Sequence, residues 1–436
     1  MSLTSEVPNK ALLRNRDYAI ALVARTGSRF GDEVALVALT LRLQESGGRP
    51  WEIAALLAAG LVPFILLAKI VGRVVDSADS RRILVVSTIV QAAGCAPLVF
   101  THRLSLIVAL VGLIAVGGAF SSTAWQVLIP RVVGEDQIGR ATSLSQSAFT
   151  IGSIAAPAAA GLLSGLFGTG VPLAVDTVSF VLMTAAAALI RTRRVAADPD
   201  SASQSESGWA CLRRDKLLGT LVAGLSAFVL LALMLNIVQV FLVRVTLHAS
   251  ATWYGCTEAA WMVGVLIGSV LAGRLAADAG RGRATVLGAG LMSLVFLAYG
   301  GAPSVAWLLP AGLLGGVGNG YVNVCISTLV MTRTPDHLRG RVMAALGASV
   351  NTVSVLSLAI GGAVTAVLGI REVYVAAGLS SAVVTVCLGL RMAALWRRVP
   401  AEAEPAGEVA WGDEPEAQAE AGIRAEAAMR RPSSAS

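Results

Sequence analysis

The chain has 436 residues, of which 55% are hydrophobic and only 14% charged, and its mean hydropathy is +0.72. Soluble domains carry roughly 25% charged residues, so a soluble fold of this length could not hide so much apolar surface. The net charge of +7 does not indicate nucleic-acid binding, because the basic residues lie in short segments between apolar runs rather than on one basic face.

Apolar runs of about 20 residues, the length that spans a bilayer, repeat along the whole chain. We expect twelve membrane spans, near residues 18–42, 52–75, 83–101, 104–128, 142–167, 171–190, 217–243, 252–276, 284–302, 305–331, 342–368 and 371–395. The predicted fold class is therefore an all-α polytopic membrane protein.

The polar segments predict the domain organisation. Residues 1–17 form an N-terminal segment without the apolar core of a signal peptide, and residues 18–190 form a first six-helix bundle. Residues 191–216, which contain ADPDSASQSESG, are expected to be a flexible linker to a second bundle at 217–396. The tail at 397–436 is rich in Ala, Glu and Pro, and we expect it to be disordered.

The distribution of basic residues predicts the orientation of the chain. If the N-terminus is cytoplasmic, then 26 of the 34 Lys and Arg residues fall in cytoplasmic segments and only five fall in outer loops. Cytoplasmic segments of membrane proteins carry such an excess, so both termini are expected in the cytoplasm. The preference for Arg over Lys, with abundant Ala and Gly, is typical of a GC-rich bacterial genome and hence of a bacterial plasma membrane.

The two halves repeat with an offset of 201 residues. Three pairs of matching positions fall at the same places in the topology: Gly72-Arg73 with Gly273-Arg274, Gly139-Arg140 with Gly340-Arg341, and Gly161 with Gly362. Six spans repeated after a cytoplasmic loop predict two halves of the same orientation, which is one known plan of transporters.

Two cytoplasmic loops carry the same pattern of a glycine, an acid and basic residues. The loop after span 2 holds Gly72, Arg73, Asp76, Arg81 and Arg82, and the loop after span 8 holds Gly273, Arg274 and Asp278. The glycine is expected to allow two helices to approach closely. The acid is expected to lie beside the positive N-terminal end of a helix from the other half.

This arrangement would form a latch between the halves on the cytoplasmic side. We expect Asp76 close to Arg341 at the start of span 11, and Asp278 close to Arg140 at the start of span 5. The alternative is a plain basic loop with incidental acids.

These loops resemble the signature loop of the major facilitator superfamily, and the resemblance covers about residues 10–395. Asp79 stands where the family often has a second glycine, and the second copy has one extra residue before its acid. The resemblance implies the major facilitator fold, with two pseudo-symmetric six-helix bundles whose spans 1, 4, 7 and 10 line a central cavity.

Further stretches resemble the drug and siderophore exporter branch of this superfamily, whose members are proton antiporters. They are Ser28-Arg-Phe-Gly-Asp32 in span 1 and Ile129-Pro-Arg-Val-Val-Gly-Glu-Asp-Gln-Ile-Gly-Arg140 before span 5. Gly152, Pro157 and Gly161 in span 5 are similar to the antiporter motif, although an alanine replaces a glycine before the proline. Pro157 could equally be a simple kink among small residues.

Span 1 contains four charged residues: Arg25, Arg29, Asp32 and Glu33. Each charge near the bilayer centre costs about 2.5–3.5 kcal/mol. At 100° per residue all four fall on one helix face, so they are expected to face a cavity or the bundle interior. Arg29 can pair with Asp32 at i+3 or with Glu33 at i+4. The group is either a proton-titrating or substrate-binding site, with Asp32 as the proton carrier, or an ion pair that fixes helix packing.

Other polar residues are candidates for the lining of the central cavity. They are Gln126 in span 4, Asn236 and Gln239 in span 7, Glu258 in span 8, and Asn319 and Asn323 in span 10. Each alone is more often an interhelical hydrogen bond than a ligand contact. Asp176, near the outer end of span 6, is a further intramembrane acid. The glycines at 315–320 lie within an apolar run without a preceding strand, so they indicate close helix packing rather than a nucleotide loop.

The predicted function is secondary active transport, most consistent with proton-coupled efflux of small amphipathic organic molecules by a monomer. The expected partners are the bilayer and a small-molecule substrate, with the proton gradient as energy source and without a metal or an organic cofactor. An importer, a membrane subunit, or a sensor or lipid-scrambling member without proton coupling are the alternatives. The sequence contains no GxxxxGK[ST] motif, so this chain does not hydrolyse ATP with a P-loop and is not expected to be an enzyme.

Overall fold

The structure is a computed structural model, which describes Leu12 and residues 14–134, 137–190, 216–274, 278–334 and 339–396. The predicted linker at 191–216 and the tail at 397–436 lie almost wholly outside the described residues. The helices from Arg16 to Met392 belong to one compact unit.

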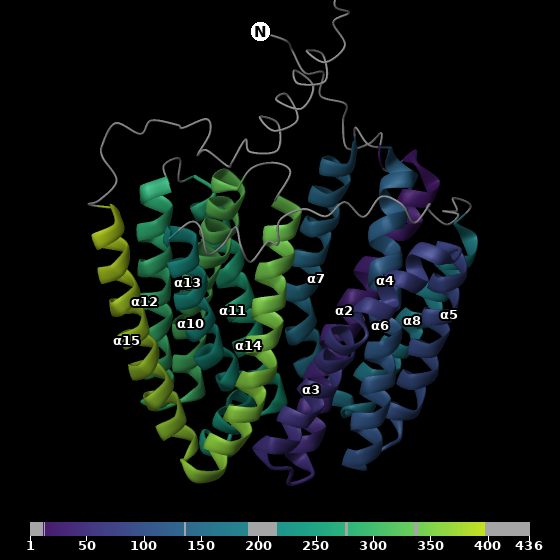
Figure 1. Cartoon of the computed structure of the whole chain (residues 1–436). Coiled ribbons are helices and arrows are strands. Elements are labelled where there is room, and N and C mark those ends of the chain that lie inside the picture. Colours follow the sequence, from purple (N-terminus) through teal and green to yellow (C-terminus); the bar gives the residue numbers. More distant parts are fainter. Residues whose placement is uncertain are drawn as a thin grey trace, which may run out of the picture. The chain divides into compact units, whose positions relative to one another are not determined.

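Seven helices of the first half follow one another in purple to blue (Figure 1). They are α2 (Arg16–Glu45), α3 (Pro50–Leu66), α4 (Ala68–Ser77), α5 (Ser80–Cys95), α6 (Leu104–Val133), α7 (Ile138–Phe167) and α8 (Gly170–Leu189). α3 and α4 are bent by 53° and together take the place of the second predicted span. Pro63 lies in the last turn of α3, where its missing N–H weakens the helix just before the bend.

The second half contains six long helices. They are α10 (Lys216–Phe241), α11 (Ala251–Ala272), α12 (Asp278–Gly300), α13 (Val305–Arg333), α14 (Arg339–Val367) and α15 (Ile370–Trp396). A short 3₁₀-helix, η1 (Ala96–Val99), continues α5, and a π-helix, η4 (Leu242–Thr246), continues α10. Each predicted span thus corresponds to one helix or one bent pair, and the all-helical polytopic fold is confirmed.

Local sequence explains where several helices begin and end. Asn15 caps α2 by accepting the N–H of Tyr18 at 3.3 Å, and Ser250 caps α11 by accepting the N–H of Trp253 at 3.4 Å. Gly134 and Gly168 follow α6 and α7 with φ of 79° and 78°, a backbone region that favours glycine. The polar caps and the terminating glycines therefore fix the lengths of helices whose interiors are apolar.

Nine helices within the described ranges are long and apolar enough to cross a membrane, or ten if α3 and α4 count as one span. α2 is not among them because its charges lower its mean hydropathy, and only residues Ser349–Thr365 of α14 form an apolar stretch. The charged residues of α2 line cavities inside the bundle, so the lower hydropathy of this helix does not argue against a span there.

The helices keep the offset of 201 residues found in the sequence. α3 and α11 begin at Pro50 and Ala251, α6 and α13 at Leu104 and Val305, and α7 and α14 at Ile138 and Arg339. The contacts between halves follow the same relation, because α7 packs against α11 and α3 packs against α14. The repeat is therefore a repeat of structure as well as of sequence.

Arginines cap equivalent carbonyl groups in the two halves. Arg42 of α2, 3% exposed, donates from Nη1 to the carbonyl of Thr101 at 3.0 Å. Arg371 of α15 donates from Nη2 to the carbonyl of Ala302 at 2.9 Å, and Ala302 lies 201 positions after Thr101. A guanidinium at a helix C-terminus satisfies unpaired carbonyls and interacts favourably with the helix dipole. Equivalent helix ends in the two halves are thus capped by arginines from helices that are not equivalent.

Candidate functional site

Two adjoining cavities lie in the bundle, and Met262 of α11 belongs to the lining of both. The first, of about 340 Å³, is called the acidic cavity because Glu33 and Glu258 line it. The second, of about 480 Å³, is called the arginine cavity because Arg25 and Arg29 line it.

The acidic cavity lies between the halves and gathers polar residues from both. Glu33 comes from α2, and Asn236 and Gln239 come from α10. Glu258 of α11 and Asn319 of α13 complete this polar set. These five are among the residues that the sequence proposed as cavity lining, and the structure brings them together around one space.

An aromatic wall faces these polar groups, and sequence reasoning did not find it. It is formed by Tyr254, Trp261, Phe296, Tyr299 and Tyr374. Trp261 stacks on Phe296 with ring centroids 6.4 Å apart, and Tyr299 contacts Tyr374 at 5.7 Å. The hydroxyl of Tyr374 is buried without a hydrogen-bond partner among the described residues. Such a wall presents large amphipathic surfaces with polar ends to a bound molecule.

The arginine cavity is built mainly from the first half. Arg25, Arg29 and Asp32 line it together with Trp125, which is 1% exposed. The guanidinium of Arg25 lies over the ring of Trp125 at 5.7 Å and over the ring of Phe149 at 5.2 Å. Both distances are within the range of a cation–π interaction, so Arg25 is held between α6 and α7.

The four charges of α2 divide between the two cavities. Arg29 pairs with Glu33, with Nη2 and Oε1 3.4 Å apart, and among the described residues Asp32 has no ion pair of its own. Asp32 faces the arginine cavity and Glu33 the acidic cavity. The expected single site is therefore two sites on adjacent residues. Of the two pairings open to Arg29, the i+4 pair with the longer glutamate is the one formed.

Asp176 of α8 lies directly behind this region. It is 2% exposed, and its carboxylate accepts hydrogen bonds from Ser179 Oγ at 3.2 Å and from Cys95 Sγ at 3.3 Å. A Cβ at Gly31 would lie 2.5 Å from Asp176 Oδ1, so α2 and α8 touch at the residue before Asp32. The sequence indicated that Asp176 lies inside the protein, because an acid in an apolar span rarely faces lipid.

The halves meet at one end of the bundle, where α3 and α11 begin and α7 and α14 end. A Cβ at Gly161 would lie 2.8 Å from the Cα of Gly255, and a Cβ at Gly362 would lie 3.4 Å from the Cβ of Ala54. These two contacts are related by the offset of 201. We call this end, defined by Glu45, Ala54, Gly161, Gly255 and Gly362, the clamped end.

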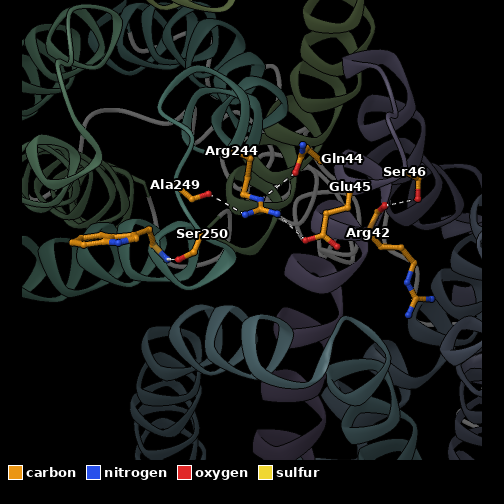
Figure 2. Close-up of polar contacts among 8 residues, drawn as sticks. Arg42, Gln44, Glu45, Ser46, Arg244, Ala249 and Ser250 are labelled. Atoms are coloured by element: carbon orange, nitrogen blue, oxygen red, sulfur yellow. Dashed lines mark hydrogen bonds and ion pairs between the residues drawn. The ribbon is translucent and has the colours of Figure 1, made fainter.

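Polar contacts between the halves add to the clamped end. Figure 2 shows Arg244 of η4 pointing toward Gln44 and Glu45 at the end of α2. Arg244 Nη2 lies 2.9 Å from Glu45 Oε1, and Arg244 Nε donates to Gln44 Oε1 at 3.2 Å. A third bond, from Nη1 to the carbonyl of Ala249 at 2.9 Å, fixes the guanidinium within its own half.

The antiporter-like residues of α7 differ in their surroundings. The carbonyl of Pro157 abuts Gly255, and Gly161 is in backbone contact with α11. Gly152 has no neighbour closer than 3.9 Å to an added Cβ, and those neighbours belong to α2. Pro157 and Gly161 therefore contribute to the clamped end, whereas Gly152 does not.

The signature loop is partly outside the described residues. The side chains of Asp76, Asp278 and Arg341 are not described, so the cytoplasmic latch, including its partner Arg140, stays a prediction. The expected close helix approach at Gly72 is wrong in this structure, because an added Cβ there would meet nothing within 4 Å.

The described part of the loop after α4 has a capping role. Asp79 accepts the N–H of Arg81 at 2.9 Å and caps α5, and the guanidinium of Arg81 donates to the carbonyl of Ala188 at the end of α8. This capping explains an acid where the family often has glycine. Arg73 and Arg82 are exposed, as is Arg274.

Two expected lining residues are not found around either cavity. Gln126 is exposed, while its neighbour Trp125 faces the arginine cavity. Asn323 donates from Nδ2 to the carbonyl of Asn319 at 3.0 Å, one turn from the acidic cavity. The prediction of close packing for residues 315–320 is confirmed, because a Cβ at Gly318 would lie 2.6 Å from the carbonyl oxygen of Gly288 in α12.

Comparison with known proteins decides the family. Residues 21–256 and 234–432 match the Major Facilitator Superfamily. The chain belongs to this superfamily. Major Facilitator Superfamily proteins are transporters, and the chain is a multi-pass membrane protein of this superfamily.

Individual relatives are distant. The chain is 24% identical over 247 residues to macrolide efflux protein A of Streptococcus pyogenes, which covers 54% of this chain and 61% of that protein. The match thus spans less than two thirds of that relative. The multidrug efflux pump Tap of Mycolicibacterium fortuitum is 22% identical over 388 residues, covering 83% of this chain and 92% of Tap.

A solved structure supports the Major Facilitator Superfamily fold. The nucleoside transporter NupG superimposes with a TM-score of 0.69 at 12% identity, covering 86% of this chain and 99% of that one. At this identity the likeness concerns the fold alone. It confirms the predicted two-bundle architecture of a major facilitator transporter.

Proposed function

We propose that this transporter exports small amphipathic organic molecules in exchange for protons, by alternating access. The observation that carries the proposal is the acidic cavity. It lies between the halves, holds the carboxylates of Glu33 and Glu258, and is walled by aromatic rings. Amphipathic molecules match such a mixture of apolar area and few polar groups.

The clamped end supports the mechanism of alternating access. With both termini in the cytoplasm, as the basic residues predict, the clamped end is extracellular. Backbone contact between Gly161 and Gly255, together with the Arg244–Glu45 pair, holds that end closed. The molecule then stands in the state that loads from the cytoplasm, and export requires these contacts to separate.

Asp32 is the proposed proton carrier. It faces the arginine cavity without an ion pair among the described residues, while the neighbouring Glu33 is held by Arg29. A carboxyl that is not held by a cation can gain and lose its proton during the cycle without breaking a salt bridge. The preceding residue, Gly31, packs against Asp176, which places a second acid close by.

Relatives favour export over import. Macrolide efflux protein A and the multidrug efflux pump Tap are both named as efflux proteins. We therefore include the direction of transport, efflux, in the proposal for this chain. At 22–24% identity, the proposal does not extend to the particular substrates of these relatives.

Transport into inside-out vesicles tests the proposal. A radiolabelled macrolide is offered outside vesicles whose interior is acidified, and the expected result is accumulation that collapses when nigericin abolishes the pH gradient. Vesicles without the protein give the background from passive diffusion. Accumulation that is unchanged by nigericin would contradict proton coupling, and gradient-driven loss of label from preloaded vesicles would contradict export.

A further inference from the structure

The arginine cavity differs in charge from the acidic cavity that adjoins it. Arg25, Arg29 and Asp32 line the arginine cavity. Arg29 forms an ion pair with Glu33. Arg25 has no ion pair with a carboxylate among the residues that the structure describes. When Asp32 carries a proton, as proposed above, Arg25 lacks a counter-charge in this cavity, which is costly unless a partner is supplied.

Arg25 is held in a geometry that leaves its donors available. Its guanidinium carbon lies over the rings of Trp125 and Phe149, at 5.7 and 5.2 Å from their centroids. Stacking uses the face of a guanidinium, whereas its five N–H donors lie along the edge. A planar fork fixed in this way matches the two oxygens of a carboxylate.

Two further buried groups on the same wall lack hydrogen-bond partners. Trp125 is 1% exposed and Gln91 is 6% exposed, and both line the arginine cavity. Within the described residues, neither Trp125 Nε1 nor Gln91 Oε1 has a partner. Buried polar atoms are nearly always satisfied, so a donor and an acceptor left open beside one cavity point to a bound group.

These three groups specify the chemistry of that ligand. Arg25 supplies a positive charge, and Trp125 Nε1 supplies a neutral donor for an anionic oxygen. Gln91 Oε1 accepts from a nearby N–H or O–H of the ligand. A single uncompensated guanidinium fits one negative charge.

We propose that the arginine cavity is a subsite for a carboxylate with a neighbouring N–H or O–H group, carried by an amphipathic molecule that extends toward the acidic cavity. The inference rests on the proposed function only in that the cavities hold the transported molecule. It extends the substrate class to acylated or sulfonylated amino acids and similar monoanions, which the acidic cavity, with Glu33 and Glu258 as its charged residues, would reject.

Three fluorescent probes that share one dansyl group and differ in charge test this subsite. Dansylglycine is an anion with an N–H beside its carboxylate, dansylcadaverine is a cation, and dansylamide is neutral. Equilibrium binding is measured by fluorescence in nanodiscs without any pH gradient. The assay is thus independent of transport, so a failure of proton coupling leaves its outcome untouched.

For the wild-type protein we expect dansylglycine to bind more tightly than dansylamide. Arg25→Gln should raise the Kd of dansylglycine about tenfold, the effect of losing a charge-assisted hydrogen bond. The Kd of dansylcadaverine should stay within about twofold, and its retention shows in the same sample that the protein is folded. Glu258→Gln is the matched variant, expected to weaken dansylcadaverine and not dansylglycine.

A second variant keeps the test decisive if Arg25→Gln fails to fold. Trp125→Phe retains an aromatic ring beneath the guanidinium and removes only the Nε1 donor, so it should weaken dansylglycine about threefold to tenfold. Equal weakening of all three probes by Arg25→Gln and Trp125→Phe would mean that the cation–π cluster is only structural. Wild-type binding of dansylglycine no tighter than that of dansylamide would also overturn the inference.

Discussion

Arg244 and Glu45 join the two halves of the transporter, with Nη2 and Oε1 2.9 Å apart (Figure 2). Arg244 lies in the π-helix η4, and Glu45 is the last residue of α2. π-Helices occur often at functional sites, and this one places a guanidinium where α2 ends. The pair is therefore positioned to hold the clamped end and to break when that end opens.

Arg244→Ala is expected to favour opening of the clamped end. The exposed ion pair and its neighbouring hydrogen bond contribute about 1 kcal/mol, which corresponds to about a fivefold shift between closed and open states. Spin labels at the exposed residues Phe167 and Trp253 report the distance between α7 and α11. The distribution should gain a longer component, which the charge exchange Arg244→Glu with Glu45→Arg should reduce. An unchanged distribution in Arg244→Ala would show that the pair does not hold this end.

Gly161→Ala is expected to prevent close packing of the clamped end. Its Cβ would lie 2.8 Å from both the carbonyl oxygen of Ala251 and the Cα of Gly255, and backbone atoms cannot move away cheaply. Overpacking of this kind costs about 1–3 kcal/mol, so transport should fall roughly tenfold or more.

Gly152→Ala is the matched control for that variant, because it lies on the same helix with its nearest neighbours 3.9 Å from the added Cβ. It should transport at close to the wild-type rate. Equal activity of Gly161→Ala and Gly152→Ala in vesicle uptake would rule out the proposed contact.

Gly31→Ala is expected to destabilise the first half. Its Cβ would lie 2.5 Å from Asp176 Oδ1 and 2.6 Å from Ser179 Oγ. The free energy of unfolding should drop by about 1–3 kcal/mol, measured as a lower Tm in detergent. Gly27→Ala, one turn earlier and without neighbours within 4 Å, should not lower the Tm, and adding Ser179→Ala to Gly31→Ala should recover part of the loss. A Tm of Gly31→Ala equal to that of Gly27→Ala would refute the contact between α2 and α8.

The orientation is tested by labelling single cysteines in intact cells with a membrane-impermeant maleimide, in a background free of native cysteines. Cysteine at His248, an exposed residue at the clamped end, should react, whereas cysteine at Ser203 or in the tail should react only after lysis. Labelling at Ser203 from outside would reverse the orientation that the basic residues predict.

Much of the fold could be predicted from the sequence, because apolar runs, capping residues and glycines are local signals. α7 begins within four residues of the predicted span and ends where predicted, at Phe167. The offset of 201 matched Gly161 with Gly362, and the structure shows that both lie at equivalent contacts between the halves. The bend between α3 and α4 was missed, although Pro63 marked it.

The site was predicted less completely, since it depends on which residues meet across helices. Helical spacing placed Asp32 and Glu33 on one face, yet a cavity boundary runs between them. The aromatic wall was missed because a lone Tyr374 or Tyr299 in an apolar span carries no sign of its neighbours. Trp125 lines a cavity, whereas the next residue, Gln126, does not. Neighbouring residues of a helix point about 100° apart, and the sequence does not show which of the two faces the cavity.

Substrate-driven proton movement through Asp32 is the most direct test of the central claim. Purified protein is reconstituted in proteoliposomes with an acidic interior, and the gradient is followed with a quenched acridine dye while a macrolide is added outside. The wild-type protein and Glu33→Gln should release protons upon addition. Asp32→Asn should release none, yet still exchange labelled for unlabelled macrolide across the membrane. Proton release by Asp32→Asn at the wild-type rate, or macrolide accumulation by the wild-type protein without proton release, would contradict the account.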